Sequence, residues 1–236
     1  MTILSVIREL CPVIGLKVPD AVFSSTQREH IELQALANEM AKRIAFDTHD
    51  WSALKALGTI TGDGTAGAFS MPTDYRRMLK KANLWSSSGM ATALFHIADT
   101  DQWLGMLSRS PQWTPGAWTI IGRQIQIRPI PSTGTTIQYY YLSNGIVISS
   151  ANAVQQSFMA DTDSFALDER VLRLGMVWQW RANKGLAYAE DLATYEEALS
   201  YAIGADKGSN TIVVGRRRMP YNAGYAYPGT LGGEQF

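Results

Sequence analysis

The sequence predicts an α+β fold in which helices at the two ends of the chain can form one bundle and the middle is an antiparallel sheet or small sandwich. Apolar residues recur with helical spacing near both ends, and with the alternating spacing of strands in between. We therefore expect bundle helices in residues 1–50, an antiparallel β domain in 51–160, a helical hairpin in 161–207 and an extended arm in 208–236.

The N-terminal segment is expected to hold two helices. The first has one apolar stripe, at Ile3, Val6, Ile7 and Leu10. Pro12 and Gly15 are expected to end it. The second helix is predicted to begin near Ser25. Two residue pairs there have the spacing of a capping box, Ser24 with Gln27 and Thr26 with Glu29. The buried face of this helix is expected to comprise Leu33, Leu36, Ala37, Met40 and Ile44.

The middle of the chain is predicted to consist of short strands. A hairpin is expected from residues 57–61 and 66–70, joined by a turn at Gly62-Asp63-Gly64. The alternation is clearest at 118–129, where Ile125 and Ile127 face one side. The other expected elements are strands at 79–85, 94–97, 135–142 and 146–149 and a short helix at 99–109.

Two antiparallel helices are expected next. The first carries Leu167, Val171, Leu174 and Trp178 on one face. Asp168 lies near its start, where the helix dipole favours an anion, and Lys184-Gly185 is expected to end it. The second presents Leu192, Tyr195, Leu199 and Ile203. Trp178 and Trp180 are two residues apart and so lie on different faces, and burying both requires either a central helix or a neighbouring subunit.

The arm at 208–236 is rich in glycine, tyrosine and proline and cannot supply a core. Ordering it costs about 1–2 kcal/mol per residue, so it is either a solvated tail or is ordered by a partner. We identify an arginine cluster and spaced aromatic residues as candidate interface residues, namely Arg216, Arg217, Arg218, Tyr221, Tyr225, Tyr227 and Phe236. Trp178 and Trp180 join this candidate set.

Composition argues against several classes of protein. The chain has 21 Lys and Arg against 21 Asp and Glu, which disfavours sequence-blind binding to DNA or to an anionic membrane. Cys11 is the only cysteine, so an intrachain disulfide and thiolate zinc sites are excluded and a reducing compartment is expected. Arg8 and Glu9 make residues 1–10 a poor signal peptide, and no apolar run approaches the length of a membrane span.

Signatures of catalysis are absent from the sequence. His30, His49 and His96 have no metal-ligand spacing, and no serine or cysteine lies in a nucleophile motif. Acidic pairs occur at Asp99/Asp101, Asp161/Asp163 and Asp168/Glu169. Each pair precedes a predicted helix, so capping and dipole effects compete with an acid pair in a cleft. We assign no catalytic, cofactor-binding or metal-binding residue.

Three segments carry a resemblance to a known family. Residues 69–77, which read Phe-Ser-Met-Pro-Thr-Asp-Tyr-Arg-Arg, are followed by Trp85. Residues 120–131 look like a hairpin that ends in Pro-Ile-Pro and precedes Tyr139-Tyr140-Tyr141. Asp161-x-Asp163 leads into the closing helical hairpin. In this order the segments resemble the head-to-tail adaptor (connector) proteins of tailed bacteriophages, of the tail tubular protein A type.

The resemblance implies a helical bundle built from both ends of the chain with an inserted β domain. It also implies a dodecameric ring in the virion, assembled in the host cytoplasm, that binds the portal protein and a tail tube or nozzle protein. Genomic DNA passes through such a channel without specific binding, and a near-zero net charge suits this role. No catalytic residue or cofactor carries over from the family. Two other functions stay open: a virion-associated hydrolase, and a carbohydrate- or receptor-binding tail module that uses exposed Trp113 and Trp118.

Overall fold

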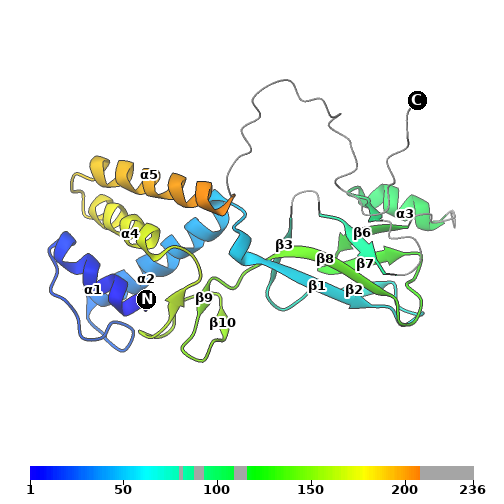
Figure 1. The fold of residues 1–236 in the computed structure, drawn as a ribbon, viewed down its shortest axis with the longest axis horizontal. Coiled ribbons are helices and arrows are strands. Elements are labelled where there is room, and N and C mark those ends of the chain that lie inside the picture. Colours follow the sequence, from blue (N-terminus) through cyan, green and yellow to red (C-terminus); the bar gives the residue numbers. More distant parts are fainter. Residues whose placement is uncertain (80–81, 88–92, 109–115, 208–236) are drawn as a thin grey trace, which may run out of the picture. The chain divides into compact units, whose positions relative to one another are not determined.

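The computed structural model describes residues 1–79, 82–87, 93–108 and 116–207. These residues fall into two compact units, which we call the helical unit and the β unit (Figure 1). The helical unit comprises Met1–Lys55 and the chain from Leu142 through the last helix, and the β unit comprises Ala56–Tyr141. Both helices and sheets are present, so the predicted α+β class is confirmed.

The helical unit is built around one helix, α4 (Glu169–Asn183), which packs against α1 (Ile3–Ile14), α2 (Arg28–Arg43) and α5 (Ala189–Asp206) (Figure 1). A short π-helical segment, Ile44–Thr48, continues α2, and a 3-10 turn at Ser52–Leu54 follows. Gly175 lets α2 and α4 approach closely, because a Cβ at that position would lie 2.7 Å from atoms of Met40.

The N-terminal helices have the predicted buried faces but differ at their ends. The apolar stripe of α1 is buried, and Gly15 ends the helix in a left-handed conformation with φ of 79°. Pro12, however, lies inside α1, since burial of Leu10 and Cys11 holds the last turn in place. The prediction of a capping box at the start of α2 is also wrong. Helix α2 begins at Arg28 after Gln27, whose side chain makes no capping bond. The Ser25 hydroxyl instead accepts the N–H of Gln27 and bonds His30 Nδ1.

Helix α4 has the expected cap and end, but it begins at Glu169, so Leu167 lies before it, and of the predicted face only Val171 is buried. The Asp168 side chain accepts hydrogen bonds from the N–H groups of Arg170 and Val171 and so caps α4. Gly185, with φ of 70°, follows its end. In α5 the predicted face is less deeply buried than its pattern suggests, since only Tyr195 and Ala198 are buried.

A small antiparallel sheet belongs to the helical unit. Its strands are β9 (Val147–Ile148), β10 (Val154–Gln155) and β11 (Ser164–Phe165), with β9 in the centre. The expected β domain extends to residue 160, whereas residues 142–165 group with the helices. One reason is Asn38 on α2, whose amide oxygen accepts the N–H of Phe158 at 2.7 Å.

The β unit contains one sheet of eight strands within the described residues, in the order β1-β8-β4-β5-β6-β7-β2, with β3 paired to β8. The strands are β1 (Lys55–Thr61), β2 (Ala68–Ser70), β3 (Tyr75–Met78), β4 (Leu84–Ser86), β5 (Ala93–His96), β6 (Ala117–Ile121), β7 (Gln124–Arg128) and β8 (Thr136–Ser143). Helix α3 (Thr100–Ser108) lies between β5 and β6 in the chain and buries Trp103.

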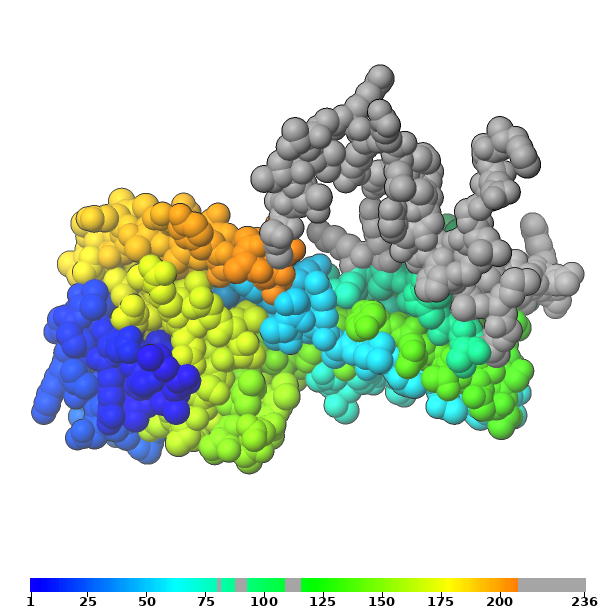
Figure 2. Space-filling model, viewed as in Figure 1, coloured from blue at the N-terminus to red at the C-terminus, as the bar shows by residue number. Residues whose placement is uncertain are grey.

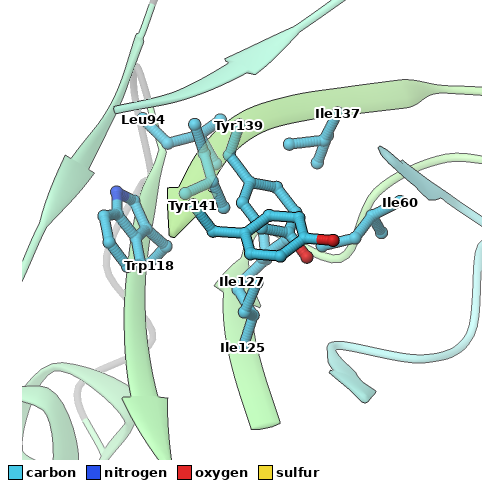
Figure 3. Close-up of a cluster of buried hydrophobic side chains, with 9 residues drawn as sticks. Ile60, Leu94, Trp118, Ile125, Ile127, Ile137, Tyr139 and Tyr141 are labelled. Atoms are coloured by element: carbon cyan, nitrogen blue, oxygen red, sulfur yellow. The ribbon is translucent and has the colours of Figure 1, made fainter. Parts of the chain in front are cut away.

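One apolar cluster forms the core of the β unit (Figure 3). Ile125 and Ile127 on β7 point into it together with Tyr139 and Tyr141 on β8, so the predicted alternation is confirmed. The two tyrosine rings lie 6.0 Å apart. Gly58 on β1 makes room for one of them, because a Cβ there would lie 2.4 Å from the ring of Tyr139.

Two sequence-based expectations for the sheet are wrong. The segments expected to form a hairpin do not pair with each other: β1 pairs with β8 and β2 with β7. The turn itself is bonded elsewhere, since Gly62 N–H donates to the carbonyl of Thr135 and Gly64 N–H to that of Pro131. The sheet is also not wholly antiparallel. Strands β5 and β6 are parallel, because the connection through α3 is long enough to return the chain to the starting edge.

Candidate interaction surfaces

Trp178 and Trp180 are both covered by their own chain, because α4 is the central helix of its unit. Trp180 is only 5% exposed, and Lys184 Nζ lies 4.6 Å from the centroid of its ring. Trp178 is half-buried, with ring centroids 6.1 Å from Tyr195 and 6.3 Å from Tyr188. A neighbouring subunit is therefore not needed to explain their burial, and their role at an interface stays a prediction.

The other candidate interface residues lie outside the described residues. These are Arg216, Arg217, Arg218, Tyr221, Tyr225, Tyr227 and Phe236. The same holds for Trp113. Trp118, by contrast, is 2% exposed and belongs to the core of the β unit, where His96 stacks on its ring at 4.2 Å. The expectation that Trp118 is exposed is therefore wrong, since its strand β6 lies within the sheet.

The acidic pairs hold backbone rather than converging on a cleft. Asp161 accepts the N–H groups of Val22 and Phe23, and Asp163 accepts those of Met159 and Ala160. Asp163 is 2% exposed. Asp168 caps α4, and the Asp99 side chain accepts the N–H of Asp101 at 2.9 Å at the start of α3. Glu169 pairs with the N-terminal amino group at 2.9 Å. The capping explanation holds for Asp99 and Asp168 and is wrong for Asp161 and Asp163, which fasten loops.

A cluster of His49, Ser52 and Asp206 contains the residue types of a hydrolytic triad in the wrong order. Both His49 Nε2 and the Ser52 hydroxyl bond the carboxylate of Asp206, the histidine at 2.9 Å. The histidine therefore does not lie between serine and acid, as a general base must. Burial raises the pKa of Asp206, but the hydrogen bonds from Ser52 and His49 outweigh it and hold that pKa below its usual value. The cluster ties the segment before β1 to the end of α5.

Two of the three segments that carry the family resemblance meet in the β unit. The Tyr141 hydroxyl donates to Asp74 Oδ1 at 2.7 Å, and the rings of Tyr75 and Tyr141 lie 5.8 Å apart. Burial and the bond to Asp74 raise the pKa of Tyr141. One hydrogen bond thus joins the Pro-x-Asp-Tyr segment to the tyrosine-rich strand. In the expected turn, Asp63 accepts the N–H groups of Thr65 and Ala66, which is the role of a turn residue and not of an ion ligand.

Two surfaces of the helical unit were missed by reasoning from the sequence. A groove of about 650 Å³ lies between α2 and α4. Its lining includes Glu32, which bonds both Lys184 at 2.5 Å and Arg28 at 2.9 Å. The second surface is the exposed side of α5. Its signal was visible in the sequence, since 189–206 contains five acids and no Lys or Arg: Glu190, Asp191, Glu196, Glu197 and Asp206.

Comparison with known proteins identifies the family. The model of the SU10 adaptor protein family matches residues 1–220. The chain belongs to the SU10 adaptor protein family. A search of curated proteins found no match. Family membership supports the general role of a bacteriophage adaptor, a structural component of the virion, and suggests a structural rather than a catalytic role.

Two further findings concern the described residues alone. No group of three or more His, Cys, Asp or Glu side chains there is arranged to hold a metal ion. Within the same ranges, no helix combines the length and the apolar character needed to cross a bilayer.

Proposed function

We propose that this protein is the head-to-tail connector of a tailed bacteriophage, forming a closed ring, a dodecamer, between the portal protein and a tail tube or nozzle protein. The observation that carries the proposal is membership of the SU10 adaptor family over residues 1–220. The ring continues the DNA channel, and genomic DNA passes through it without specific binding. Balanced charge supports this, since a strongly basic lumen would retain DNA through counterion release.

In this proposal the helices from the two ends of the chain act as one bundle, and the β domain is an insertion within it. Two features support the idea. The N–H of Ile3 donates to the carbonyl of Asp163 at 2.7 Å, and Arg173 on α4 bonds Glu9 on α1 at 2.9 Å. These contacts join residues about 160 positions apart, so neither end is complete without the other. The segments quoted in the sequence analysis also resemble connectors of the tail tubular protein A type, and we propose the same kind of role.

The test is the oligomeric state of the full-length protein, alone and mixed with the portal protein of the same phage. Native mass spectrometry and electron microscopy should find a closed ring with twelve copies, and the protein should be present in finished virions. A chain that stays monomeric with its portal and is missing from virions would overturn the proposal. Neither alternative function gains support, because the acidic pairs hold backbone and Trp118 is buried.

A further inference from the structure

The outer face of α5 is a helix surface without a partner among the described residues. We define this α5 outer face by six exposed residues: Glu190, Ala193, Glu196, Glu197, Ser200 and Tyr201. Tyr201 is 72% exposed, although tyrosine usually covers part of its ring in a folded protein. Figure 2 shows α5, in yellow to orange, at the surface of the helical unit. The helix buries only Tyr195 and Ala198, on its opposite side.

The negative charge of this face is not neutralised by described residues. Of the five acids in α5, Asp191 pairs with Arg181 at 2.6 Å and Asp206 bonds His49. Glu190, Glu196 and Glu197 have no ion pair within the described ranges. The helix supplies no Lys or Arg of its own. Three carboxylates therefore share this face with an exposed aromatic ring, a combination that suits a cationic segment with its own aromatic residues.

The chain contains one such segment, the arm at 208–236, which begins directly after α5. It carries Arg216, Arg217 and Arg218 followed by Tyr221, Tyr225 and Tyr227, against a single acid, Glu234. Guanidinium groups pair with carboxylates through two parallel hydrogen bonds and stack on aromatic rings. An extended chain advances about 3.3 Å per residue, so the arginine cluster can lie about 30 Å from Lys207. This distance is about the length of α5, which rises about 1.5 Å per residue. The arginine cluster is therefore able to contact a neighbouring subunit.

We propose that the arm of one copy docks on the α5 outer face of the neighbouring copy in the ring, with Arg216, Arg217 and Arg218 on the carboxylates of Glu190, Glu196 and Glu197. This inference rests on the proposed ring. A contact in which one surface of each copy meets a different surface of the next is the kind that closes into a ring. Tyr201 gives the arginines or the arm tyrosines a ring to stack on.

Charge reversal with rescue tests the contact on assembled rings of the full-length protein. One variant combines Glu196→Lys with Glu197→Lys, and the other combines Arg216→Glu, Arg217→Glu and Arg218→Glu. Each should raise the protein concentration needed for half-assembly about tenfold at low salt, because several exposed ion pairs add up. The loss should shrink as salt screens the wild-type contact. Combining both sets of substitutions should restore assembly. The matched control, Glu29→Lys with Glu39→Lys on exposed sites of α2, should assemble as wild type does.

Crosslinking decides which copy supplies the arm. One protein carries Ala193→Cys and a second, mass-tagged protein carries Tyr221→Cys, while Cys11 is buried and does not compete. Mixed under oxidising conditions, the two proteins should give a disulfide-linked pair of unequal mass. In a chain that carries both substitutions, a disulfide confined to single chains would show that the arm folds back on its own α5 and would overturn the proposal. Rings that assemble normally with either charge reversal would also overturn the proposal. So would an equal loss of assembly in the α2 control, together with no restoration when both reversals are combined. A wild-type protein that forms no ring even with its portal, and is missing from virions, overturns the proposed function itself.

Discussion

Both units of this protein bury apolar side chains, but they differ in the contacts that add to this burial. In the helical unit, side-chain carboxylates bond backbone groups far away in the sequence: Asp161 accepts the N–H of Val22, and Asp206 accepts that of Ser52. In the β unit, alternating apolar side chains surround Tyr139 and Tyr141, and glycine makes room for the rings. We therefore expect the stability of the helical unit to depend on single carboxylates, and the stability of the β unit to fall when a substitution adds volume to its core.

The largest expected effect is on the β unit, from Gly58→Ala. The added Cβ would lie 2.4 Å from Tyr139, and a buried aromatic ring on the next strand cannot move aside as a flexible side chain can. We expect a loss of about 3 kcal/mol or more in the free energy of unfolding of this unit, from overpacking of its core. Urea denaturation followed by hydrogen exchange should place the loss in residues 56–141. Unchanged protection there would contradict the structural reason.

Gly175→Ala provides the comparison in the helical unit. Its Cβ would meet Met40 at 2.7 Å, but the atoms involved are the Cγ and Sδ of a flexible side chain. A better helix propensity of alanine, worth about 1 kcal/mol, also offsets part of the strain. Gly175→Ala should therefore destabilise its unit clearly less than Gly58→Ala destabilises the β unit. Equal losses in the two variants would show that the units do not differ in their tolerance of volume.

Loss of a carboxylate should reverse the order of sensitivity. Asp163→Ala leaves the N–H groups of Met159 and Ala160 without an acceptor in a site that is 2% exposed. An unsatisfied buried donor costs about 1–3 kcal/mol, so the free energy of unfolding of the helical unit should fall by at least that amount. Asp63→Ala is the matched control in the β unit, because Asp63 also accepts two N–H groups but is exposed. Hydrogen exchange should show a strong effect only for Asp163.

Removal of the cap on α4 should have a smaller effect. Asp168→Ala deprives the N–H groups of Arg170 and Val171 of their acceptor near the surface, and the expected loss is about 0.5–2 kcal/mol. Thermal unfolding measures it, with Asp168→Asn as the variant that keeps a capping oxygen. Neither this substitution nor alanine at Asp161, Asp163 or Glu169 should abolish any reaction. A turnover that disappears in a folded variant would contradict the structural role of these acids.

Much of the fold could be predicted, because the spacing of apolar residues in a short segment indicates which face of a helix or strand is buried. The stripe on α1, the alternation of Ile125 and Ile127, and the cap at Asp168 are each determined by neighbouring residues. The errors concern partners that are distant in sequence. Residues 57–70 read as a hairpin, yet β1 pairs with β8 and β2 with β7, because nothing local specifies which strand accepts a ladder of hydrogen bonds. For the same reason, the loops bonded by Asp161 and Asp163 could not be foreseen.

The interaction surfaces were predictable only in part. The tryptophan pair on α4 was found from its spacing, but whether a neighbouring helix or a neighbouring subunit covers it depends on tertiary packing. The acidic character of α5 was visible in the sequence, since 189–206 contains no Lys or Arg. What the sequence could not tell is which acids lie on the exposed side, because the helix is only weakly amphipathic and its outward face follows from the burial of Tyr195 and Ala198.

The smallest expected effect is a dependence on pH that belongs to the helical unit. The pKa of Asp206 is lowered in the folded protein: burial raises it, but the bonds from Ser52 and His49 outweigh that cost. A lowered pKa means that the unfolded chain binds the proton more tightly. The contribution of Asp206 to stability is therefore fully present above the usual pKa of an aspartate, falls as the pH drops through that value, and is gone below the lowered one.

Asp206→Asn tests this dependence, since an amide keeps one acceptor oxygen but does not titrate in this range. The variant should be less stable than the wild type near neutral pH, and the difference should shrink as the pH falls below about 4. Hydrogen exchange across pH 3–7 should place the change in residues 44–55 and in the last turns of α5. His49→Gln should reproduce part of the loss, because it removes one of the bonds that hold the carboxylate. If the difference between Asp206→Asn and the wild type stays constant with pH, the Asp206 cluster contributes packing alone, and the contrast between a carboxylate-held unit and an apolar one is weaker than the geometry indicates.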